Sequence, residues 1–547
     1  MNNTRKDAIE RFADFFREAR PTDEAKVKNM PVKERLEYAV IEGVREDLIK
    51  NLDKALKKDN PLDIINGPLM DGMAIVGERF GANQLIIAEV LESAEVMKAA
   101  VSYLESKLPE GEKSESRGKI ILATVKGDVH DIGKNLVDMI LSNNGYEVVN
   151  LGIKVPPAKL LEAVREHKPD IIGLSGLLVK SAQMMVATAE DLHSAGVDIP
   201  IIVGGAALTR DFTLTRISPA YDDIVFYAED AMKGLTLCHN LQDPVERETL
   251  YESWREIQKE RLEKYNKKIK VKPVIVPKEN IGWREVDIPS APDHEIHFYE
   301  PEDLDEVFSF INKKMLYGKH LGLPRPEERL TDEDDKQAQK VLKAVNRVKE
   351  EAKSGDWFKP KALYSWIETW SKGDNLYWNY NGSSVELNLP RQQRDSFLCA
   401  ADWVAPEGKG DSVVMFITTS GKEPNEIALR WKEEGRLLDS FILQVLAIES
   451  AEALAEIVHQ KIRKEWGIPD KDDITLKEIF KSKYHGVRLS FGYPACPDLE
   501  DHTKLFNLLK PEKKIGVRLT SGFMMEPEAS VSALVFHHPD GHYFRAE

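Results

Sequence analysis

The chain has 547 residues, which is enough for three or four domains with a core each. Its 92 acidic residues outnumber the 76 Lys and Arg, and the net charge of −16 argues against a broad nucleic-acid-binding surface. The 3 cysteines are scattered and predict neither a disulfide framework nor a cysteine-rich zinc site. The N-terminal stretch has no signal-peptide core and no apolar run reaches about 18 residues, so we expect a cytoplasmic protein without membrane contact.

The first part of the chain is predicted to be helical. Residues 1–22 are a charged helical segment, and residues 23–112 repeat apolar side chains every three or four positions, which indicates an antiparallel four-helix bundle. Such stripes are more often core than ligand contacts. However, Phe80 lies at the predicted end of one helix, and Ile87 and Val90 lie in the first turn of the next. Side chains at such a mouth could instead cover a ligand outside the bundle.

Residues 113–243 are predicted to form a doubly wound, Rossmann-like α/β domain of five strand–helix units. The apolar run at 120–125 indicates a strand buried on both faces, and the loop after it carries Asp128, His130 and Gly133. This loop lies at the carboxyl end of a parallel strand, where open α/β sheets bind ligands. The Asp could accept a proton from one ring nitrogen of the His and leave the other for a metal, although a polar turn with a helix-capping Asp is the commoner arrangement.

Two further loops of this domain place small or polar residues at predicted strand ends. Ser175 and Leu177 follow one strand, and Gly204 and Gly205 follow the next. The ordered set of Asp-x-His-x-x-Gly, Ser-x-Leu and Gly-Gly resembles the cobalamin-binding domain of B12-dependent methyltransferases and mutases. In that family the histidine replaces the cofactor's own base on cobalt, and the displaced nucleotide tail enters a cleft.

The resemblance implies roles for residues of this domain. His130 would bind the cobalt of cobalamin, held as methylcobalamin, with Asp128 as its hydrogen-bond partner and Ser181 as the next link. A further set would line the cleft for the nucleotide tail. This set is Gly133, Ser175, Leu177, Val179, Gly204 and Gly205, with Val179 where a Thr is common.

Residues 244–275 are charged and helical, and we expect a solvated linker that allows domain movement. From 276 to 547, mixed helices and alternating strands predict an α+β domain with an antiparallel sheet. Its stretch RLSFGYPACPD begins with Arg488, whose planar guanidinium suits a carboxylate, and contains Gly492 and Tyr493 in a predicted loop. Taken alone, an ordinary turn with a surface salt bridge explains the stretch equally well.

Two motifs extend the resemblance to nearly the whole chain. The sequence GPLMDGM at 67–73 resembles the cap domain of cobalamin-dependent methionine synthases, and GYPACP at 492–497 resembles their S-adenosylmethionine-binding activation domain. By this resemblance Phe80, Ile87 and Val90 would cover the upper face of the corrin and shield its methyl group.

The resemblance also implies a set of contacts to S-adenosylmethionine. Arg488 would bind the carboxylate, and Asp305 and Glu452 would face the amino and sulfonium end. The loop backbone would come from Ser490, Gly492 and Tyr493, and Tyr543 would be a further contact. Ser490 stands where some relatives have Ala.

The family's zinc-containing homocysteine domain and its methyltetrahydrofolate barrel have no counterpart in the sequence, so we expect the C-terminal half of such a methyltransferase. By resemblance it would carry a methyl group on cobalt and remethylate cob(I)alamin from S-adenosylmethionine, with an electron from flavodoxin or a similar reductase. The homocysteine- and methyltetrahydrofolate-binding domains would be its partners, and zinc is expected only there.

Three other functions are alternatives. A non-catalytic corrinoid carrier or a B12-dependent light sensor can combine a helical bundle with the same cobalamin domain, but a sensor should add a DNA-binding domain. The acidic charge and the GYPACP motif argue against a sensor. A radical mutase would need a substrate barrel, for which the sequence offers no candidate.

Overall fold

The computed structural model describes residues 27, 30–82, 84–108, 116–269, 282–392, 397–520 and 522–544. The chain forms two compact units. The first comprises Met1–Glu78 and Glu92–Ser114, and the second comprises Arg79–Leu91 and Glu115–Glu547. The predicted segment 1–22 lies outside the described residues.

The first unit contains the predicted helical bundle. Its helices, two of which extend into the second unit, are α3 (Val32–Ile41), α4 (Leu48–Ala55), α5 (Pro61–Ile64), the π-helical turn η1 (Ile65–Leu69), α6 (Met70–Gly81) and α7 (Ile87–Glu105). Helices α3 and α6 approach closely, because Gly72 has no side chain and a Cβ there would lie 3.0 Å from the Cβ of Val40. The chain bends between α5 and α6, where Pro68 cannot donate a helical hydrogen bond.

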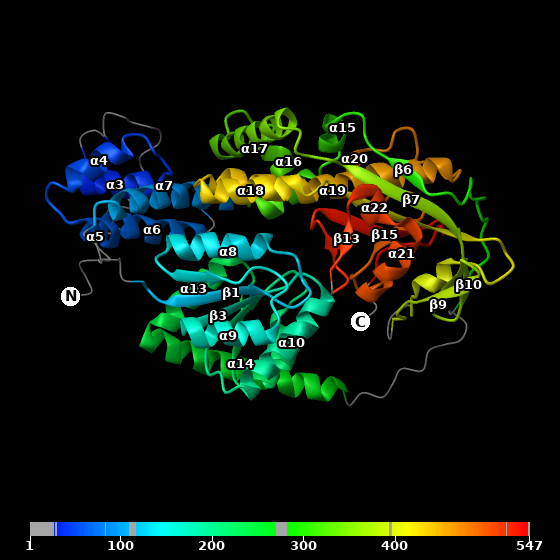
Figure 1. Ribbon diagram of the computed structural model, residues 1–547, viewed down its shortest axis with the longest axis horizontal. Helices are drawn as coiled ribbons and strands as arrows, with labels where there is room; N and C mark the ends of the chain where they lie inside the picture. Colours follow the sequence, from blue (N-terminus) through cyan, green and yellow to red (C-terminus); the bar gives the residue numbers. More distant parts are fainter. Residues whose placement is uncertain are drawn as a thin grey trace. The chain divides into compact units, whose positions relative to one another are not determined.

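The second unit begins with the predicted parallel sheet, which has the strand order β2-β1-β3-β4-β5. Its strands are β1 (Lys119–Thr124), β2 (Glu147–Asn150), β3 (Ile171–Ser175), β4 (Ile201–Gly204) and β5 (Val225–Tyr227). Its helices are α8 (Ile132–Asn143), α9 (Pro157–His167), α10 (Val179–Ser194), α11 (Arg210–Phe212), η2 (Thr213–Ile217), α12 (Ser218–Tyr221) and α13 (Ala231–Gln242). Helices α8 and α13 cover one face, and α9 and α10 the other (Figure 1). The strand order reverses between β1 and β3, so the loops after these two strands diverge and leave a crevice.

Helix α14 (Pro244–Ile269) differs from the predicted solvated linker. Trp254 is buried and packs edge-to-face on Phe226 of β5, and the Arg210 guanidinium lies 4.5 Å from the centre of the Trp254 ring. The charged composition of the helix did not indicate this packing, because only Trp254 and Tyr251 make the aromatic contacts to Phe226. The first half of α14 is therefore part of the α/β domain.

The rest of the second unit is an α+β domain, and its five-stranded sheet of order β12-β15-β11-β7-β6 is antiparallel throughout, as predicted. The strands are β6 (His297–Tyr299), β7 (Lys361–Glu368), β11 (Ser412–Thr419), β12 (Val487–Ser490) and β15 (Ser530–Phe536). Smaller sheets contain β8 (Trp370–Lys372), β9 (Asn375–Tyr380), β10 (Ser383–Asn388), β13 (Arg518–Leu519) and β14 (Met525–Glu526). The helices are α15 (Leu304–Ser309), η4 (Lys314–His320), α16 (Pro326–Arg329), α17 (Lys336–Ser354), η5 (Ala400–Trp403), α18 (Glu423–Glu433), α19 (Leu437–Glu465), α20 (Leu476–Ile479), η6 (Leu499–Asp501), α21 (His502–Leu509) and α22 (Pro511–Ile515).

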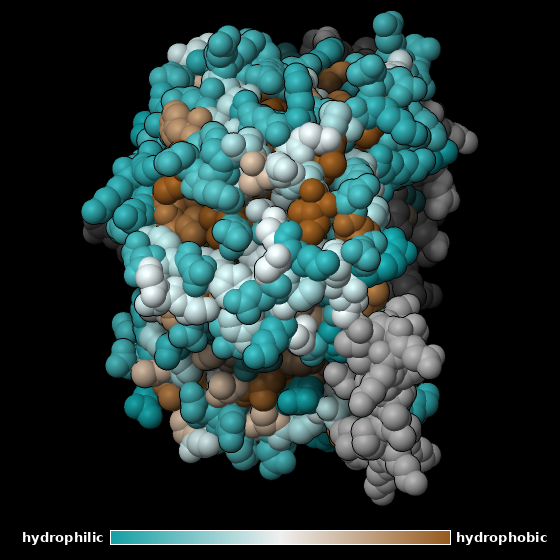
Figure 2. Space-filling model, turned by 90° about the vertical axis from the view of Figure 1, so that its right-hand side faces the viewer, coloured by the Kyte–Doolittle hydropathy of each residue, from teal (hydrophilic) through white to brown (hydrophobic). Residues whose placement is uncertain are grey.

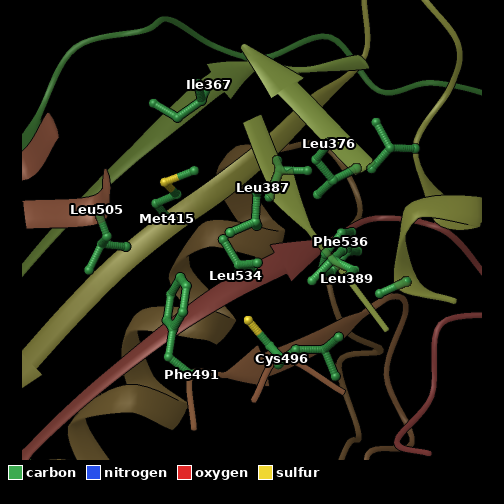
Figure 3. Close-up of a cluster of buried hydrophobic side chains, with 14 of the residues drawn as sticks. Ile367, Leu376, Leu387, Leu389, Met415, Phe491, Cys496, Leu505, Leu534 and Phe536 are labelled. Atoms are coloured by element: carbon green, nitrogen blue, oxygen red, sulfur yellow. The ribbon is translucent and has the colours of Figure 1, made fainter. Parts of the chain in front are cut away.

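One face of the large antiparallel sheet packs on the β8–β10 sheet. Figure 3 shows Met415 of β11 and Leu534 of β15 among Leu376 and Leu387 from the smaller sheet, all of them buried. The 29-residue helix α19 contacts β7, β11 and β15 as well as α17 and α18. Because it is covered from several sides, apolar residues occur around nearly its whole circumference. The polar residues it does carry are therefore informative.

The outer surface agrees with the acidic, charge-rich composition. The face that Figure 2 shows is mainly hydrophilic, with apolar side chains in small separate groups. Among the described helices, none has the length and apolar content required to span a membrane.

His502 predicts an acid-sensitive step in the stability of the α+β domain. Its Nδ1 lies 2.7 Å from the Phe523 carbonyl oxygen and must donate, so Nε2, 2.7 Å from the Ser532 hydroxyl, accepts. Burial lowers the pKa of His502 from 6.5 to about 4, although the bond to Phe523 opposes the shift. Since only the neutral ring fits, its contribution is complete above pH 6.5 and is lost as the pH falls towards 4, by up to about 3 kcal/mol.

Between pH 6.5 and pH 4, we expect the free energy of unfolding to fall by more in the wild type than in the His502→Gln variant. Thermal unfolding at several pH values measures this difference. His485→Gln, which changes an exposed histidine of the same domain, is the control and should follow the wild type. Parallel pH curves for wild type and His502→Gln would contradict the assignment.

Candidate functional site

The predicted histidine loop is held by a single buried carboxylate. Asp128 Oδ1 accepts hydrogen bonds from the Nδ1 of His130 at 2.7 Å and from its backbone N–H at 2.9 Å. Asp128 Oδ2 accepts from the Leu177 N–H at 2.8 Å and from the Ser181 hydroxyl at 2.5 Å. Burial raises the pKa of Asp128, but its bonds to His130 and Ser181 outweigh burial, so the net pKa is lowered and the group stays ionised.

These bonds fix the tautomer and direction of the imidazole. Because an ionised Asp128 can only accept, Nδ1 of His130 carries the proton and Nε2 is left as the basic nitrogen. Burial lowers the pKa of His130, but Asp128 and the nearby carboxylate of Glu528 together raise it above its ordinary value. A neutral imidazole oriented by a carboxylate is the form in which histidine binds metals.

A cavity of about 560 Å³ lies beside this loop, within the second unit. On the α/β side its lining includes five predicted residues, namely His130, Gly133, Ser175, Leu177 and Gly205. No atom lies within 4 Å of a Cβ placed on Gly133, so the backbone there is open to a large group. Gly205 is required by packing, since a Cβ there would lie 1.7 Å from the Gly176 carbonyl oxygen. Gly204 and Val179 adjoin this lining without being part of it.

The other side of the same cavity is formed by the α+β domain. Arg488 is buried, and its Nη2 donates to Glu456 Oε1 at 3.0 Å and to Glu452 Oε2 at 3.4 Å. Burial opposes the charge of Arg488, but Glu456 and Glu452 raise its pKa, so it stays protonated. Tyr493 also lines the cavity, and Ile87 from the helical segment reaches it. The predicted Arg488, Glu452 and Tyr493 are thus brought together with His130.

A second cavity of about 130 Å³ lies next to the first. Ser490, Tyr493 and Glu452 line it, together with His130 and Glu528. Gly492 has a φ of +83° and its N–H donates to the Cys496 carbonyl, which closes the GYPACP loop tightly enough that only glycine fits there.

Nine predicted residues line neither cavity, namely Asp128, Ser181, Val179, Gly204 and Gly492, which adjoin the linings in sequence or hold lining residues, and Asp305, Tyr543, Phe80 and Val90. Asp305 lies in the first turn of α15, which is capped by Asp303, and pairs with Lys353 at 2.8 Å on the surface. The Tyr543 side chain is 54% exposed. Partial burial raises the pKa of its hydroxyl to about 12, although the nearby positive charge of Arg488 opposes this shift. Phe80 lies in the last turn of α6 and Val90 in the first turn of α7, and neither is among the lining residues.

Sequence reasoning missed several lining residues. Glu456 lies one helical turn after Glu452 on α19, and that spacing could have identified it, because such residues share a helix face. Glu528 comes from the loop before β15, and no sequence signal places it beside His130. His320 and Glu449, paired at 3.0 Å, also line the larger cavity.

Contacts between the two domains of the second unit close the sides of the cavity. An apolar cluster joins Val129 and Leu178 to Leu499 and Met524. Ion pairs join Lys432 to Asp138 at 2.7 Å and Lys154 to Glu526 at 3.4 Å. At Gly522 a Cβ would lie 2.5 Å from the Cα of Gly127, so two backbones meet there directly.

Comparison with protein families agrees with this architecture. Residues 303–547 match the family described as vitamin B12 dependent methionine synthase, activation domain. Residues 118–236 and 32–105 match two families that are each described as B12 binding domain. The chain thus carries segments similar to two B12 binding domains, followed by one similar to the activation domain of vitamin B12 dependent methionine synthase.

Individual relatives point the same way. The methionine synthase of Mycobacterium tuberculosis is 34% identical over 555 residues, which cover 95% of this chain and 46% of that protein. The methionine synthase of Mycobacterium leprae is 34% identical over 577 residues, which cover 96% of this chain and 47% of that protein. The chain therefore spans about half the length of these relatives. Among solved structures, the MetH reactivation domain bound to AdoHcy is 26% identical, with a TM-score of 0.46, over 50% of this chain and 90% of that one.

The two glycines at the carboxyl end of β4, Gly204 within the strand and Gly205 directly after it, should respond differently to alanine. Gly205→Ala places a methyl group on the Gly176 carbonyl at a positive φ of +147°, and we expect it to lower the free energy of unfolding by roughly 3 kcal/mol. Gly204→Ala meets only the Ala228 carbonyl oxygen, at 3.5 Å, and should change stability little. Chemical denaturation of both variants measures this, and equal stabilities would contradict the packing argument.

Proposed function

We propose that this chain is the cobalamin-carrying and reactivation portion of a methionine synthase. The observation that supports this most is the single cavity that has the His130 imidazole on one side and the Arg488–Glu452 pair on the other. A methyl acceptor held at the first group would face a methyl donor held at the second. Proximity of two reactants in one enclosed site is the main contribution a protein makes to such a transfer.

The residues of the α/β domain fit a cobalamin whose own base is displaced. His130 Nε2 is the donor atom that would bind the metal, because Nδ1 is hydrogen-bonded to Asp128, which Ser181 holds in turn. The open backbone at Gly133, with Ser175 and Gly205 beyond it, suits the approach of a bulky group and its tail. When bound, the corrin supplies a cobalt centre that exchanges a methyl group and, after oxidation, needs an electron to become reactive again.

The residues of the α+β domain fit S-adenosylmethionine. Arg488 offers its guanidinium to the carboxylate of the donor, and Glu452 offers negative charge to its cationic end. The loop from Ser490 to Tyr493 supplies backbone groups and an aromatic ring beside them. Asp305 and Tyr543 belong to the proposed contacts by family resemblance, and Phe80, Ile87 and Val90 to the proposed cover of the corrin.

The proposal extends to partners and place. A reducing partner, flavodoxin or a similar reductase, would supply the electron, and homocysteine- and methyltetrahydrofolate-binding domains would use the methyl group. Methionine synthesis of this kind would take place in the cytoplasm. A corrinoid carrier would use the same His130 loop but would not require the buried Arg488 with its two acids, so this cluster favours the reactivation function over the carrier.

The first test concerns His130. We expect the purified wild type to bind methylcobalamin with a spectrum typical of histidine ligation, and His130→Gly to retain corrin with a base-off spectrum, because only the lower ligand is lost. His485→Gly removes an exposed histidine and should leave the spectrum unchanged. An unchanged spectrum in His130→Gly would exclude this residue as the cobalt ligand.

The second test concerns Arg488. Arg488→Ala should weaken S-adenosylmethionine binding by roughly 2 kcal/mol or more, the loss expected when a charge-assisted contact is not made. Methylcobalamin binding should persist, since Arg488 lies across the cavity from His130. Calorimetry measures the affinity, and Arg430→Ala, on the exposed part of α18, is the control. Equal affinities in Arg488→Ala and wild type would remove Arg488 from the donor site.

A further inference from the structure

The acid one turn beyond Glu452 occupies a distinctive position. Glu456 is 13% exposed, whereas Glu452 is 45% exposed, and its Oε1 makes the shorter of the two bonds to Arg488, at 3.0 Å. Among the described residues, Glu456 Oε2 has no hydrogen-bond partner, and neither do Nε and Nη1 of Arg488. Both side chains line the large cavity. One buried acceptor and two buried donors thus lie side by side without partners.

Such groups are costly to leave unpaired. Each buried polar atom without a hydrogen bond has lost its contact with water and gained no partner in exchange. A ligand that brings an acceptor for Arg488 and a donor for Glu456 would recover this cost. An α-amino acid carries both groups on one carbon, a carboxylate that accepts and an ammonium that donates.

The charges of the cluster point to the same ligand. Arg488 contributes one positive charge against the two carboxylates of Glu452 and Glu456. The neighbouring charged groups along α19 have partners of their own, since Glu449 pairs with His320 at 3.0 Å and Arg463 with Asp470 at 2.6 Å. His459 is neutral, because burial first, and then Arg463 and Arg488, lower its pKa well below 6.5. The site therefore has one negative charge in excess, and a sulfonium amino acid has one positive charge in excess.

We propose that Glu456 is a binding residue that recognises the α-ammonium group of the methyl donor through Oε2, while its Oε1 holds Arg488 for the α-carboxylate. This rests on the proposed function, in which the cavity takes S-adenosylmethionine. Glu452, which is more exposed and also lines the smaller cavity, is then left for the sulfonium end. Glu456 makes the site specific for zwitterionic ligands over adenosyl thioethers that lack the amino acid.

The experiment compares three ligands by calorimetry on the full chain. S-adenosylhomocysteine has both amino-acid groups and no sulfonium, its des-amino analogue keeps only the carboxylate, and 5′-methylthioadenosine has neither. On the wild type, we expect removal of the ammonium to weaken binding about 10- to 100-fold, as for a hydrogen bond to a charged group. If the wild type binds the first two ligands equally, no residue recognises the ammonium and the proposal is wrong.

The variant arm assigns the recognition to a residue. Glu456→Gln should weaken S-adenosylhomocysteine about 10- to 100-fold and leave the des-amino analogue and 5′-methylthioadenosine within about twofold of wild type. Equal losses for the first two ligands would mean that Glu456 only holds Arg488. An ammonium-dependent loss in Glu452→Gln instead would move the role to Glu452. Both outcomes overturn the assignment.

Two further readouts separate the possible failures. Methylcobalamin spectra of Glu456→Gln and Glu452→Gln report whether the variants are folded, and the wild-type ligand comparison stands even if a variant does not fold. If the wild type binds none of the three ligands nor S-adenosylmethionine, the proposed function itself is wrong. If the wild type binds them but the ammonium has no effect, only the role of Glu456 is wrong.

Discussion

The carboxylate of Asp128 is the interaction on which the site depends. It accepts from the His130 ring and from the Leu177 N–H, so one buried group joins the loop after β1 to the loop after β3. These loops stand on either side of the point where the strand order reverses. The two loops leave the sheet in opposite directions, and the shared carboxylate holds them in a defined position relative to each other. Ser181, at the start of α10, gives the carboxylate its last partner and ties the loops to a helix.

The second half of the cavity is built on a different principle. Helix α19 is buried against the antiparallel sheet, so each charged side chain on it must find a partner. Arg463 finds Asp470, and Glu452 and Glu456 share Arg488 from β12. Among these groups, and within the described residues, only the last keeps unpaired atoms next to a cavity. The unpaired hydrogen-bonding atoms of Arg488 and Glu456 are therefore available to a ligand in the cavity.

The parts of this molecule that could be predicted from the sequence are those determined by residues close together in the chain. Buried strands such as β1 and β11 are short apolar runs, and the loop of Asp128 and His130 follows from a strand end with two residues of known chemistry. For α14 the predicted helix was correct, but the expectation that all of it is solvated was wrong, because composition averages over a helix, whereas packing depends on a single residue, Trp254. Glu528 was missed for a related reason, since no periodicity connects the loop before β15 with a histidine almost four hundred residues earlier.

Glu528 shows what the contact between the two domains does to the site. Burial raises the pKa of its carboxyl to about 8, and Asp128 and Asp131 act in the same direction, while His130 opposes them. The pKa of His130 is raised as well, in part by Glu528. Glu528 therefore raises the pKa of His130, whereas His130 lowers the pKa of Glu528, because the charged forms of an acid and a base attract each other. The loop of the α+β domain thus places beside His130 a carboxyl group whose negative charge favours the protonated imidazole, while burial of the ring opposes it, so the protonation of the site is coupled to domain packing.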